Sequence, residues 1–254
     1  MSLKKLLPAV AAAAVLAGCA EVPPGAGENP ADPWEKMNRQ VNSFNYVVDS
    51  YTARPVAKAY IKVVPEGARE SVSNVFSNMG EPKNAVNNAL QGKGERSLAS
   101  VFRFLINTSF GLGGMFDVAG KVGNQPVARE DFGQTLRVWG VPQGPFLVLP
   151  FLGPSTVTDA TGTVVGWYSE PLTYAENDYV KWGGSAVGLL NLRAELMPVT
   201  DALRDAVDPY VMAREGYLAS RVNAQYDGNP PVVLLKDEFE DEDEGKAPEK
   251  KESK

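Results

Sequence analysis

Apolar residues recur at steps of three and four along most of the chain, which is the spacing of one face of an α-helix. The first such segment runs from Asp32 to Tyr51, and the sequence Asp-Pro-Trp-Glu gives it a start signal. Asp32 is predicted as the N-cap and Pro33 as the first helical residue, because no hydrogen bond is lost there. The apolar face consists of Trp34, Met37, Val41, Phe44, Val48 and Tyr51.

Further helices are predicted over residues 55–64, 66–79, 82–90, 95–107, 156–168, 177–196 and 199–223. The segment 95–107 is clearly amphipathic, with an apolar side formed by Leu98, Val101, Phe102, Leu105 and Ile106. Pro82 separates two of these helices, and Pro209 is expected to break the last one. Strand signals are sparse, so the pattern predicts an all-α fold in a single domain.

Residues 131–155 are apolar without a usable period. The segment contains Phe146, Leu147, Val148, Leu149, Phe151 and Leu152, and it is interrupted by Pro142, Pro145, Pro150 and Pro154. Because proline cannot donate a backbone hydrogen bond, an ordinary helix or central strand is not expected here. We expect a Pro/Gly-rich apolar loop or hairpin from Phe146 to Leu152, which either packs in a core or lies against lipid.

The helix predicted over residues 156–168 is rich in small residues, among them Gly162 and Gly166. Glycine inside a helix costs roughly 1 kcal/mol relative to alanine, so a reason for it is expected. The spacing Gly162-x-x-x-Gly166 would let another backbone approach closely. The partner is either a second helix in a tightly packed core or a lipid chain, and the sequence leaves both open.

The first residues contain the parts of a lipoprotein signal peptide in order. Lys4 and Lys5 form the positive region, and the apolar run from Leu6 to Leu16 is too short to span a bilayer as a stable helix. Leu-Ala-Gly-Cys follows, so residues 1–18 are predicted to be removed by cleavage between Gly18 and Cys19. Cys19 is the only cysteine and is the predicted lipidation site. An ordinary signal peptide before an incidental cysteine is the alternative.

Acyl chains on Cys19 would bury many methylene groups at about 0.8 kcal/mol each, which makes a stable membrane anchor. Ala20 resembles the sorting pattern of outer-membrane lipoproteins, in which the cysteine is not followed by Asp. Residues 19–31 are rich in Pro, Gly and Ala and are predicted to be a flexible, lipidated tether. Residues 32–228 form the predicted helical domain.

The C-terminal residues 229–254 are predicted to be a disordered, largely acidic tail. From Lys236 onward the sequence KDEFEDEDEGKAPEKKESK is made of charge blocks without apolar periodicity. The tail is either a solvated end without a specific role or a docking arm for a basic partner.

The composition excludes several classes of function. Histidine is absent, which rules out a Ser-His-Asp triad and a histidine-based zinc site, and a single cysteine rules out a cysteine cluster. The net charge of −6 argues against nucleic acid as a partner. Carboxylates occur as the neighbours Glu130 and Asp131 and as a group of three at residues 201, 205 and 208. A solvated helix face explains the group of three, with Asp201 paired to Arg204. Neither a catalytic residue nor a metal or cofactor site is predicted.

Five blocks of sequence resemble the MlaA/VacJ family, lipoproteins of the pathway that maintains lipid asymmetry. They are DPWEKMNRQVNSFNYVVD (32–49), EPKNAVNNALQGK (81–93), RFLINTSFGLGGMFDVA (103–119), EDFGQTLRVWGVPQGPFLVLPFLGPS (130–155) and DPYVMAREGYL (208–218). The blocks occur in the order found in the family and cover nearly all of the predicted domain, so the match is far more specific than a short motif.

The resemblance implies a ring of helices that lies in the outer membrane from the periplasmic side. An amphipathic channel through this ring would take misplaced phospholipids from the outer leaflet to a periplasmic lipid-binding chaperone, and a trimeric porin would hold the ring. In that setting Phe146 to Leu152 would line the channel mouth or touch lipid. The tryptophans Trp34, Trp139, Trp167 and Trp182 would suit the membrane interface, although single tryptophans are more often core residues.

One position departs from the family pattern. The family commonly has Arg before the Asp that follows the Gly-Pro-Ser sequence, whereas this chain has Thr158 before Asp159. Any salt bridge formed by that Arg must therefore come from another residue.

Three functions compete on the sequence. The first is a phospholipid-transfer channel, the second an envelope scaffold that organises porins without moving lipid, and the third a lipid-modifying enzyme. The absence of histidine weakens the third, and Ser155 after Gly153-Pro154 does not match the Gly-x-Ser-x-Gly motif of esterases.

Overall fold

A computed structural model describes residues 22–123, 127 and 129–231. Within this part of the chain the fold is helical apart from one two-stranded hairpin, which confirms the predicted all-α class. Gly18 and Cys19, with the predicted cleavage and lipidation, lie outside the described residues, as does the tail beyond residue 231. Residues 22–31 form turns, and the Gly27 N–H donates to a Glu35 carboxylate oxygen.

The first two helices are α2 (Glu35–Tyr51) and α3 (Ala53–Val63). Both were predicted, but the start of α2 was placed too early. Asp32 does not cap the helix, because its buried carboxylate accepts hydrogen bonds from Asn38, Tyr210 and Arg214. Trp34 occupies the N-cap position instead.

The predicted break at Pro82 is wrong: α4 (Glu66–Leu90) is one continuous helix with Pro82 inside it. α5 (Gly94–Ser109) packs along α4 and holds it on both sides of the proline. Asn78 donates to Thr108 at 2.9 Å, Arg103 pairs with Glu81 at 2.7 Å, and Ser97 donates to the carbonyl of Ala85 at 2.8 Å. These links between helices outweigh the loss of one backbone hydrogen bond. The short helix α6 (Val118–Gly123) follows α5.

The apolar segment 131–155 contains a short helix, which was not predicted, followed by a hairpin. α7 (Phe132–Val138) begins with a capping box, in which Asp131 accepts from the Gln134 N–H and the Gln134 side chain accepts from the Asp131 N–H. β1 (Phe146–Leu149) and β2 (Gly153–Thr156) then pair antiparallel, with Phe146 opposite Thr156. α8 (Val157–Tyr168) starts directly after β2, capped by Thr156.

The last third is divided more finely than its periodicity predicted. The 3₁₀ turn η2 (Pro171–Tyr174) and the π-helix η3 (Tyr179–Gly183) precede α9 (Gly184–Glu195). α10 (Met197–Arg204) and α11 (Pro209–Gln225) follow, so the predicted break at Pro209 is confirmed. Asp208 caps α11 by accepting from two backbone N–H groups.

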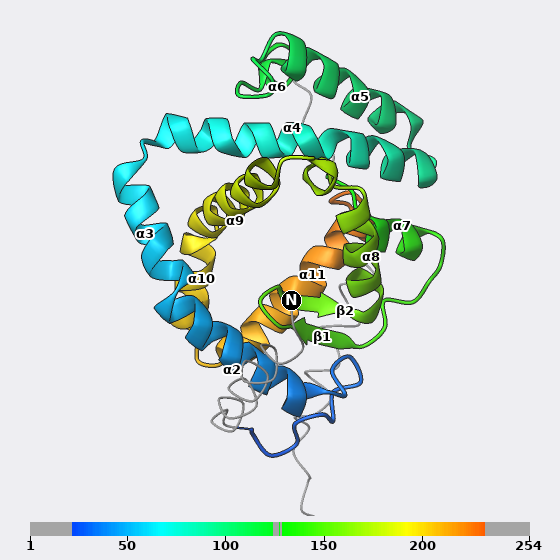
Figure 1. Cartoon of the computed structure of the whole chain (residues 1–254). Coiled ribbons are helices and arrows are strands. Elements are labelled where there is room, and N and C mark those ends of the chain that lie inside the picture. The colour runs from blue at the N-terminus through cyan, green and yellow to red at the C-terminus, as the bar shows by residue number, and fades with distance from the viewer. Residues whose placement is uncertain (1–21, 124–126, 128, 232–254) are drawn as a thin grey trace, which may run out of the picture.

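The helices are arranged as a ring (Figure 1). In this view α2, α3 and α4 follow the perimeter, while α9 and α10 on one side and α11, α8 and the hairpin on the other surround the middle. α5 lies outside the ring against α4, and α6 packs against α5. None of the described helices combines the length and the apolar character needed to cross a membrane.

Burial is inverted relative to that of a water-soluble domain. Among the described residues, 21 polar or charged residues are buried but only eight apolar ones, whereas 40 large apolar residues are exposed. The predicted apolar side of α5 shows this most clearly, because Leu98, Val101, Phe102 and Leu105 are all exposed. Soluble domains bury most residues of this type. The exposed surface therefore includes apolar faces, such as that of α5, that need an apolar neighbour.

Candidate functional site

The hairpin divides its apolar residues between a core and an exposed tip. Phe146 and Val148 are 1% and 2% exposed and pack with Tyr210 of α11, while Leu147 and Leu149 are half-buried. At the tip Phe151 is 73% exposed and Leu152 is 53% exposed. The expectation that the whole run faces lipid or a channel mouth is therefore corrected for Phe146 and Val148, which are core residues because strand geometry alternates the two faces.

Two asparagines of α2 hold the open edge of β1. Asn38 donates to the Phe146 carbonyl at 3.0 Å and accepts from the Val148 N–H at 2.9 Å. Asn45, two helical turns later, makes the same pair of bonds to the Leu149 carbonyl and the Phe151 N–H. These side chains satisfy backbone groups that would otherwise be unpaired at a strand edge.

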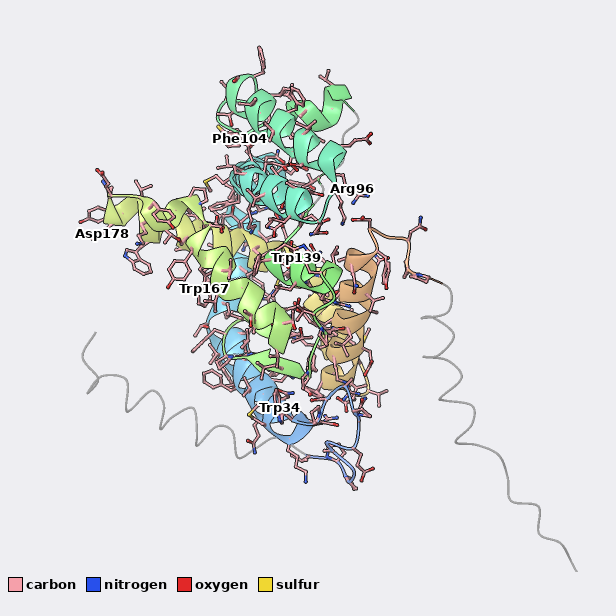
Figure 2. The ribbon with its side chains drawn as sticks, turned by 90° about the vertical axis from the view of Figure 1, so that its right-hand side faces the viewer. Trp34, Arg96, Phe104, Trp139, Trp167 and Asp178 are labelled. Carbon is pink, nitrogen blue, oxygen red and sulfur yellow. The ribbon has the colours of Figure 1, made fainter. Side chains whose placement is uncertain are left out.

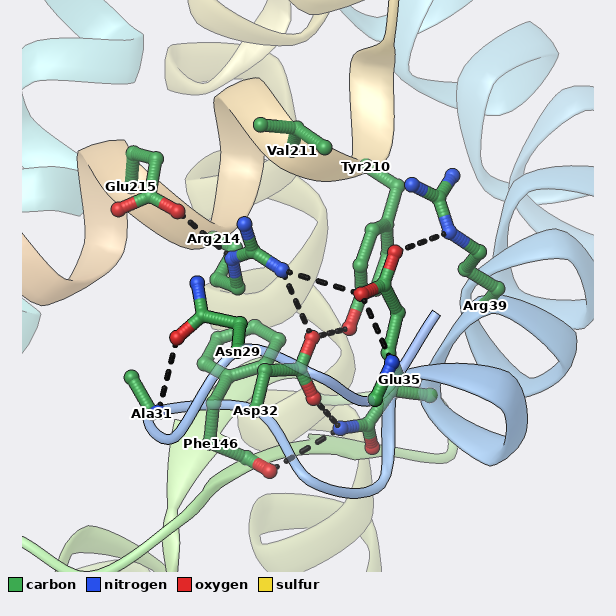
Figure 3. A network of polar contacts seen from close by, with 12 residues as sticks. Asn29, Ala31, Asp32, Glu35, Arg39, Phe146, Tyr210, Val211, Arg214 and Glu215 are labelled. Carbon is green, nitrogen blue, oxygen red and sulfur yellow. Dashed lines mark hydrogen bonds and ion pairs between the residues drawn. The ribbon is translucent and has the colours of Figure 1, made fainter. Parts of the chain in front are cut away.

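A buried polar network anchors this edge to α11 (Figure 3). The Asp32 carboxylate accepts from Asn38, from the Tyr210 hydroxyl and from Arg214, and it has no exposed surface. Burial, followed by the hydrogen bond to Asp32, raises the pKa of Tyr210 far above its usual value, so the hydroxyl stays a donor. The network therefore fixes the hairpin relative to the segment that carries Asp32 and relative to α11.

A second cluster joins α7, α8 and α11 through Arg221. Its guanidinium donates to Asp131 at 2.7 Å and 3.0 Å and to Asp159 at 2.6 Å. Asp159 also accepts from Tyr217 and Thr156 at 2.9 Å each. Arg221 thus supplies the ion pair that Thr158 cannot, because threonine carries no charge. Thr158 donates to the Pro142 carbonyl at 2.7 Å.

The two glycines of α8 have different surroundings. A Cβ on Gly162 would lie 2.4 Å from the backbone nitrogen of Gly133, so α7 and α8 touch there through their backbones. A Cβ on Gly166 would meet no described atom within 4 Å. The spacing predicted that another backbone could approach closely. At Gly162 that backbone belongs to a second helix, α7, whereas Gly166 takes no part in the contact.

Gly166 faces a cavity between α4, α7, α8 and α11. This cavity has a volume of about 430 Å³, and a second one of about 710 Å³ extends toward α9 and η2. Both are lined by Lys83, Asp131, Trp167, Glu170 and Arg221. The polar side of the larger cavity comes from α4, α7 and α11, and its apolar side includes Phe76, Leu172, Leu189 and Leu192. The pair of cavities is amphipathic.

Aromatic side chains are exposed around the molecule. Trp34, Trp139, Trp167 and Trp182 are between 42% and 69% exposed, so none of the four is a buried core residue. Figure 2 shows the segment around Asp178 projecting from the body. Tyr174, Tyr179 and Trp182 on this segment are exposed, as expected of aromatic residues at a membrane–water interface.

The remaining candidates for chemistry have structural partners. Asp201 pairs with Arg54 rather than with Arg204, and Arg204 binds Asp49. Glu130 pairs with Lys93, and Ser155 is buried with its hydroxyl on the Thr156 carbonyl. In the described part of the chain, acidic residues do not gather into a group that could hold a metal ion.

An inverted helical body with an amphipathic cavity defines a class of proteins associated with membranes and lipids rather than a soluble domain. The family model described as MlaA lipoprotein matches residues 30–224, and the chain belongs to this family. The intermembrane phospholipid transport system lipoprotein MlaA of Escherichia coli K12 is 35% identical over 230 residues, which cover 84% of this chain and 88% of that protein.

Two further relatives extend the comparison. The MlaA lipoprotein of Haemophilus influenzae is 33% identical, and the match covers 85% of this chain and 88% of that protein. An uncharacterized protein of Rickettsia felis is 40% identical, and the match covers 84% of this chain and 82% of that protein. A solved structure reported under "Structural basis for maintenance of bacterial outer membrane lipid asymmetry" superimposes with a TM-score of 0.66 at 37% identity. The superposition covers 78% of this chain and 99% of the chain in that structure.

Proposed function

We propose that this lipoprotein forms an amphipathic channel that removes mislocalised phospholipids from the outer leaflet of the outer membrane. The observation that carries the proposal is the inverted burial around an amphipathic cavity. The named relatives are lipoproteins of an intermembrane phospholipid transport system, which supports the same substrate class.

The exposed apolar surface supports a position within the bilayer. A side chain such as Phe102, 60% exposed on α5, is unfavourable in water and favourable against acyl chains. The buried charges between α4 and α5 are paired, since Arg103 of α5 binds Glu81 of α4 and also Asp117 before α6. Such pairing is required of polar groups that are surrounded by hydrocarbon.

The cavity supports movement of a molecule with a polar and an apolar end. A phospholipid head group without polar partners would cost several kcal/mol in an apolar site. Lys83, Asp131 and Arg221 offer such partners on one wall, while Leu189 and Leu192 offer apolar surface for acyl chains on another. This transfer needs no bond-making chemistry, so the proposal includes no catalytic residue.

The proposal includes the location and partners of the chain. Lipid on Cys19 would anchor it to the outer membrane from the periplasmic side, and the apolar ring would lie in the bilayer beside an outer-membrane porin trimer. The phospholipid would pass to a periplasmic lipid-binding chaperone. Cross-linking from the exposed outer face of α5 is expected to capture the porin trimer.

The test compares outer-leaflet phospholipid in cells with and without the gene. Loss of the protein is expected to raise phospholipid in the outer leaflet, and expression of the wild-type chain is expected to restore the low level. An unchanged level in the deletion strain would contradict a channel. If porin organisation were disturbed in the same cells, that result would favour the alternative of an envelope scaffold.

A further inference from the structure

Two opposite charges line both cavities without a hydrogen bond or ion pair to each other or to another described residue, although the charge of Lys83 helps to lower the pKa of the nearby Asp131. The larger cavity has seven charged lining residues, which are Lys83, Arg129, Glu130, Asp131, Glu170, Glu195 and Arg221. Glu130, Asp131, Glu195 and Arg221 have hydrogen-bond or ion-pair partners. Lys83 and Glu170 have no hydrogen-bonded or ion-paired side-chain partner in the described part of the chain, and both also line the smaller cavity. Arg129 is exposed and does not line the smaller cavity.

The lack of an ion pair between Lys83 and Glu170 points to a ligand. Both residues are half-buried, and a charge that is partly removed from water is costly unless it is paired. Their charged atoms are more than 4.0 Å apart, since no ion pair joins them. A ligand with a negative and a positive group side by side would satisfy both residues at once.

One neighbour adds to this site. Trp167 lines the same two cavities, and an indole face attracts an ammonium group.

We propose that Lys83 and Glu170 form a subsite for a zwitterionic phospholipid head group, with the phosphodiester at Lys83 and the ammonium at Glu170. This inference rests on the proposed transport function and specifies its substrate. A lipid with a phosphodiester but no ammonium, such as phosphatidylglycerol, would satisfy Lys83 and leave Glu170 unpaired. Phosphatidylethanolamine would satisfy both charges, so the subsite favours it.

The test measures which lipids remain bound to the full-length acylated protein. The protein is incorporated in nanodiscs of equal parts phosphatidylethanolamine and phosphatidylglycerol, released in mild detergent, and its retained lipids are counted by native mass spectrometry. The wild-type chain is expected to retain phosphatidylethanolamine about fivefold over phosphatidylglycerol, as one partly solvated ion pair would give. Lys83→Glu and Glu170→Lys are each expected to abolish that preference.

The double variant Lys83→Glu/Glu170→Lys separates recognition from damage to the fold. It exchanges the two charges, so a zwitterion bound in the opposite orientation is expected to recover part of the preference. Lys58→Glu on α3 and Glu176→Lys before η3 are matched controls, because both residues are exposed and line neither cavity. Both controls are expected to keep the wild-type ratio.

The outcomes distinguish the subsite from the transport proposal. If the single variants retain phospholipid at the wild-type ratio, or if Glu170→Lys has no effect while Lys83→Glu lowers both lipids equally, the zwitterionic subsite is wrong and the channel still stands. If the wild-type protein retains no phospholipid at all, the proposed function itself fails.

Discussion

Arg221 neutralises two carboxylates from two different helices. Burial alone would raise the pKa of Asp131, but the hydrogen bond and charge of Arg221 outweigh it, so the pKa lies below its usual value. A carboxylate with a lowered pKa stabilises the folded state above its unfolded pKa of about 3.9, and this contribution is lost as the pH falls through the folded pKa.

Replacing Arg221 is therefore expected to change how stability depends on pH. The wild-type protein in detergent is predicted to lose stability when the pH falls from neutral to about 3. Arg221→Met should lower the unfolding midpoint at neutral pH and lose less on acidification, because it removes the largest interactions that lower the pKa of Asp131. Thermal unfolding at both pH values measures this, with Lys62→Met on the exposed side of α3 as control. Parallel pH curves for Arg221→Met and wild type would contradict the assignment.

The contrast between Gly162 and Gly166 gives a second prediction at this scale. Gly162→Ala places a methyl group against the backbone of α7 and is expected to destabilise the fold by about 1–3 kcal/mol. Gly166→Ala meets no described atom and is expected to be neutral or to stabilise the helix by up to about 1 kcal/mol. Unfolding in denaturant compares the two, and equal effects would show that α7 and α8 are not in close contact.

At the scale of elements, the hairpin has a buried half and an exposed half. Phe146→Ala is expected to destabilise the protein by about 3–5 kcal/mol, since it leaves a cavity beside Tyr210. Phe151→Asp removes an exposed ring in contact with Phe44, and Asp tolerates the left-handed backbone at φ 66°. It should cost little stability but weaken membrane association, as measured by the binding of the non-acylated chain 20–254 to phospholipid vesicles. Equal partitioning of Phe151→Asp and wild type would show that the tip does not touch lipid.

The sequence predicts where the helices lie better than it predicts where they are interrupted or connected. Periodicity places α2, α3, α5 and α8 within a few residues, and Pro209 marks the start of α11. It fails at Pro82, because the side-chain links between α4 and α5 that preserve the helix come from residues far apart along the chain. The capping box Asp131-x-x-Gln134 was a local signal for α7 that the dense apolar residues after it obscured.

The candidate site is less predictable than the fold. Composition identifies the hairpin as unusual but cannot separate Phe146, in the core, from Phe151, at the tip, until the strand register is known. Lys83 and Glu170 stand 87 residues apart and carry no motif. Only the fold, in which α7 packs against both α4 and α8, brings them to one cavity.

At the scale of the whole molecule, inverted burial reverses the usual effects of substitution. Phe102→Ser, on the outer face of α5, is expected to change stability in detergent by no more than about 0.5 kcal/mol while reducing retention in membranes. Arg103→Met, one residue further, leaves Glu81 buried without its ion pair and is expected to cost about 3–5 kcal/mol. Unfolding in detergent measures the stability of both variants, and binding of the non-acylated chain 20–254 to phospholipid vesicles measures their membrane association. A large loss of stability for Phe102→Ser would mean that this face packs inward.

The central claim is that phospholipid passes through the amphipathic cavity, and blocking that cavity tests it most directly. Gly166→Phe adds a ring at a position that lines the smaller cavity, where an added Cβ meets no described atom within 4 Å, while Gly216→Phe is a matched control in α11, exposed and equally free of atoms around an added Cβ. With both variants present at wild-type levels in the deletion strain, Gly166→Phe is predicted to leave outer-leaflet phospholipid high, and Gly216→Phe to restore the low level. Full restoration by Gly166→Phe would contradict passage of lipid through this cavity.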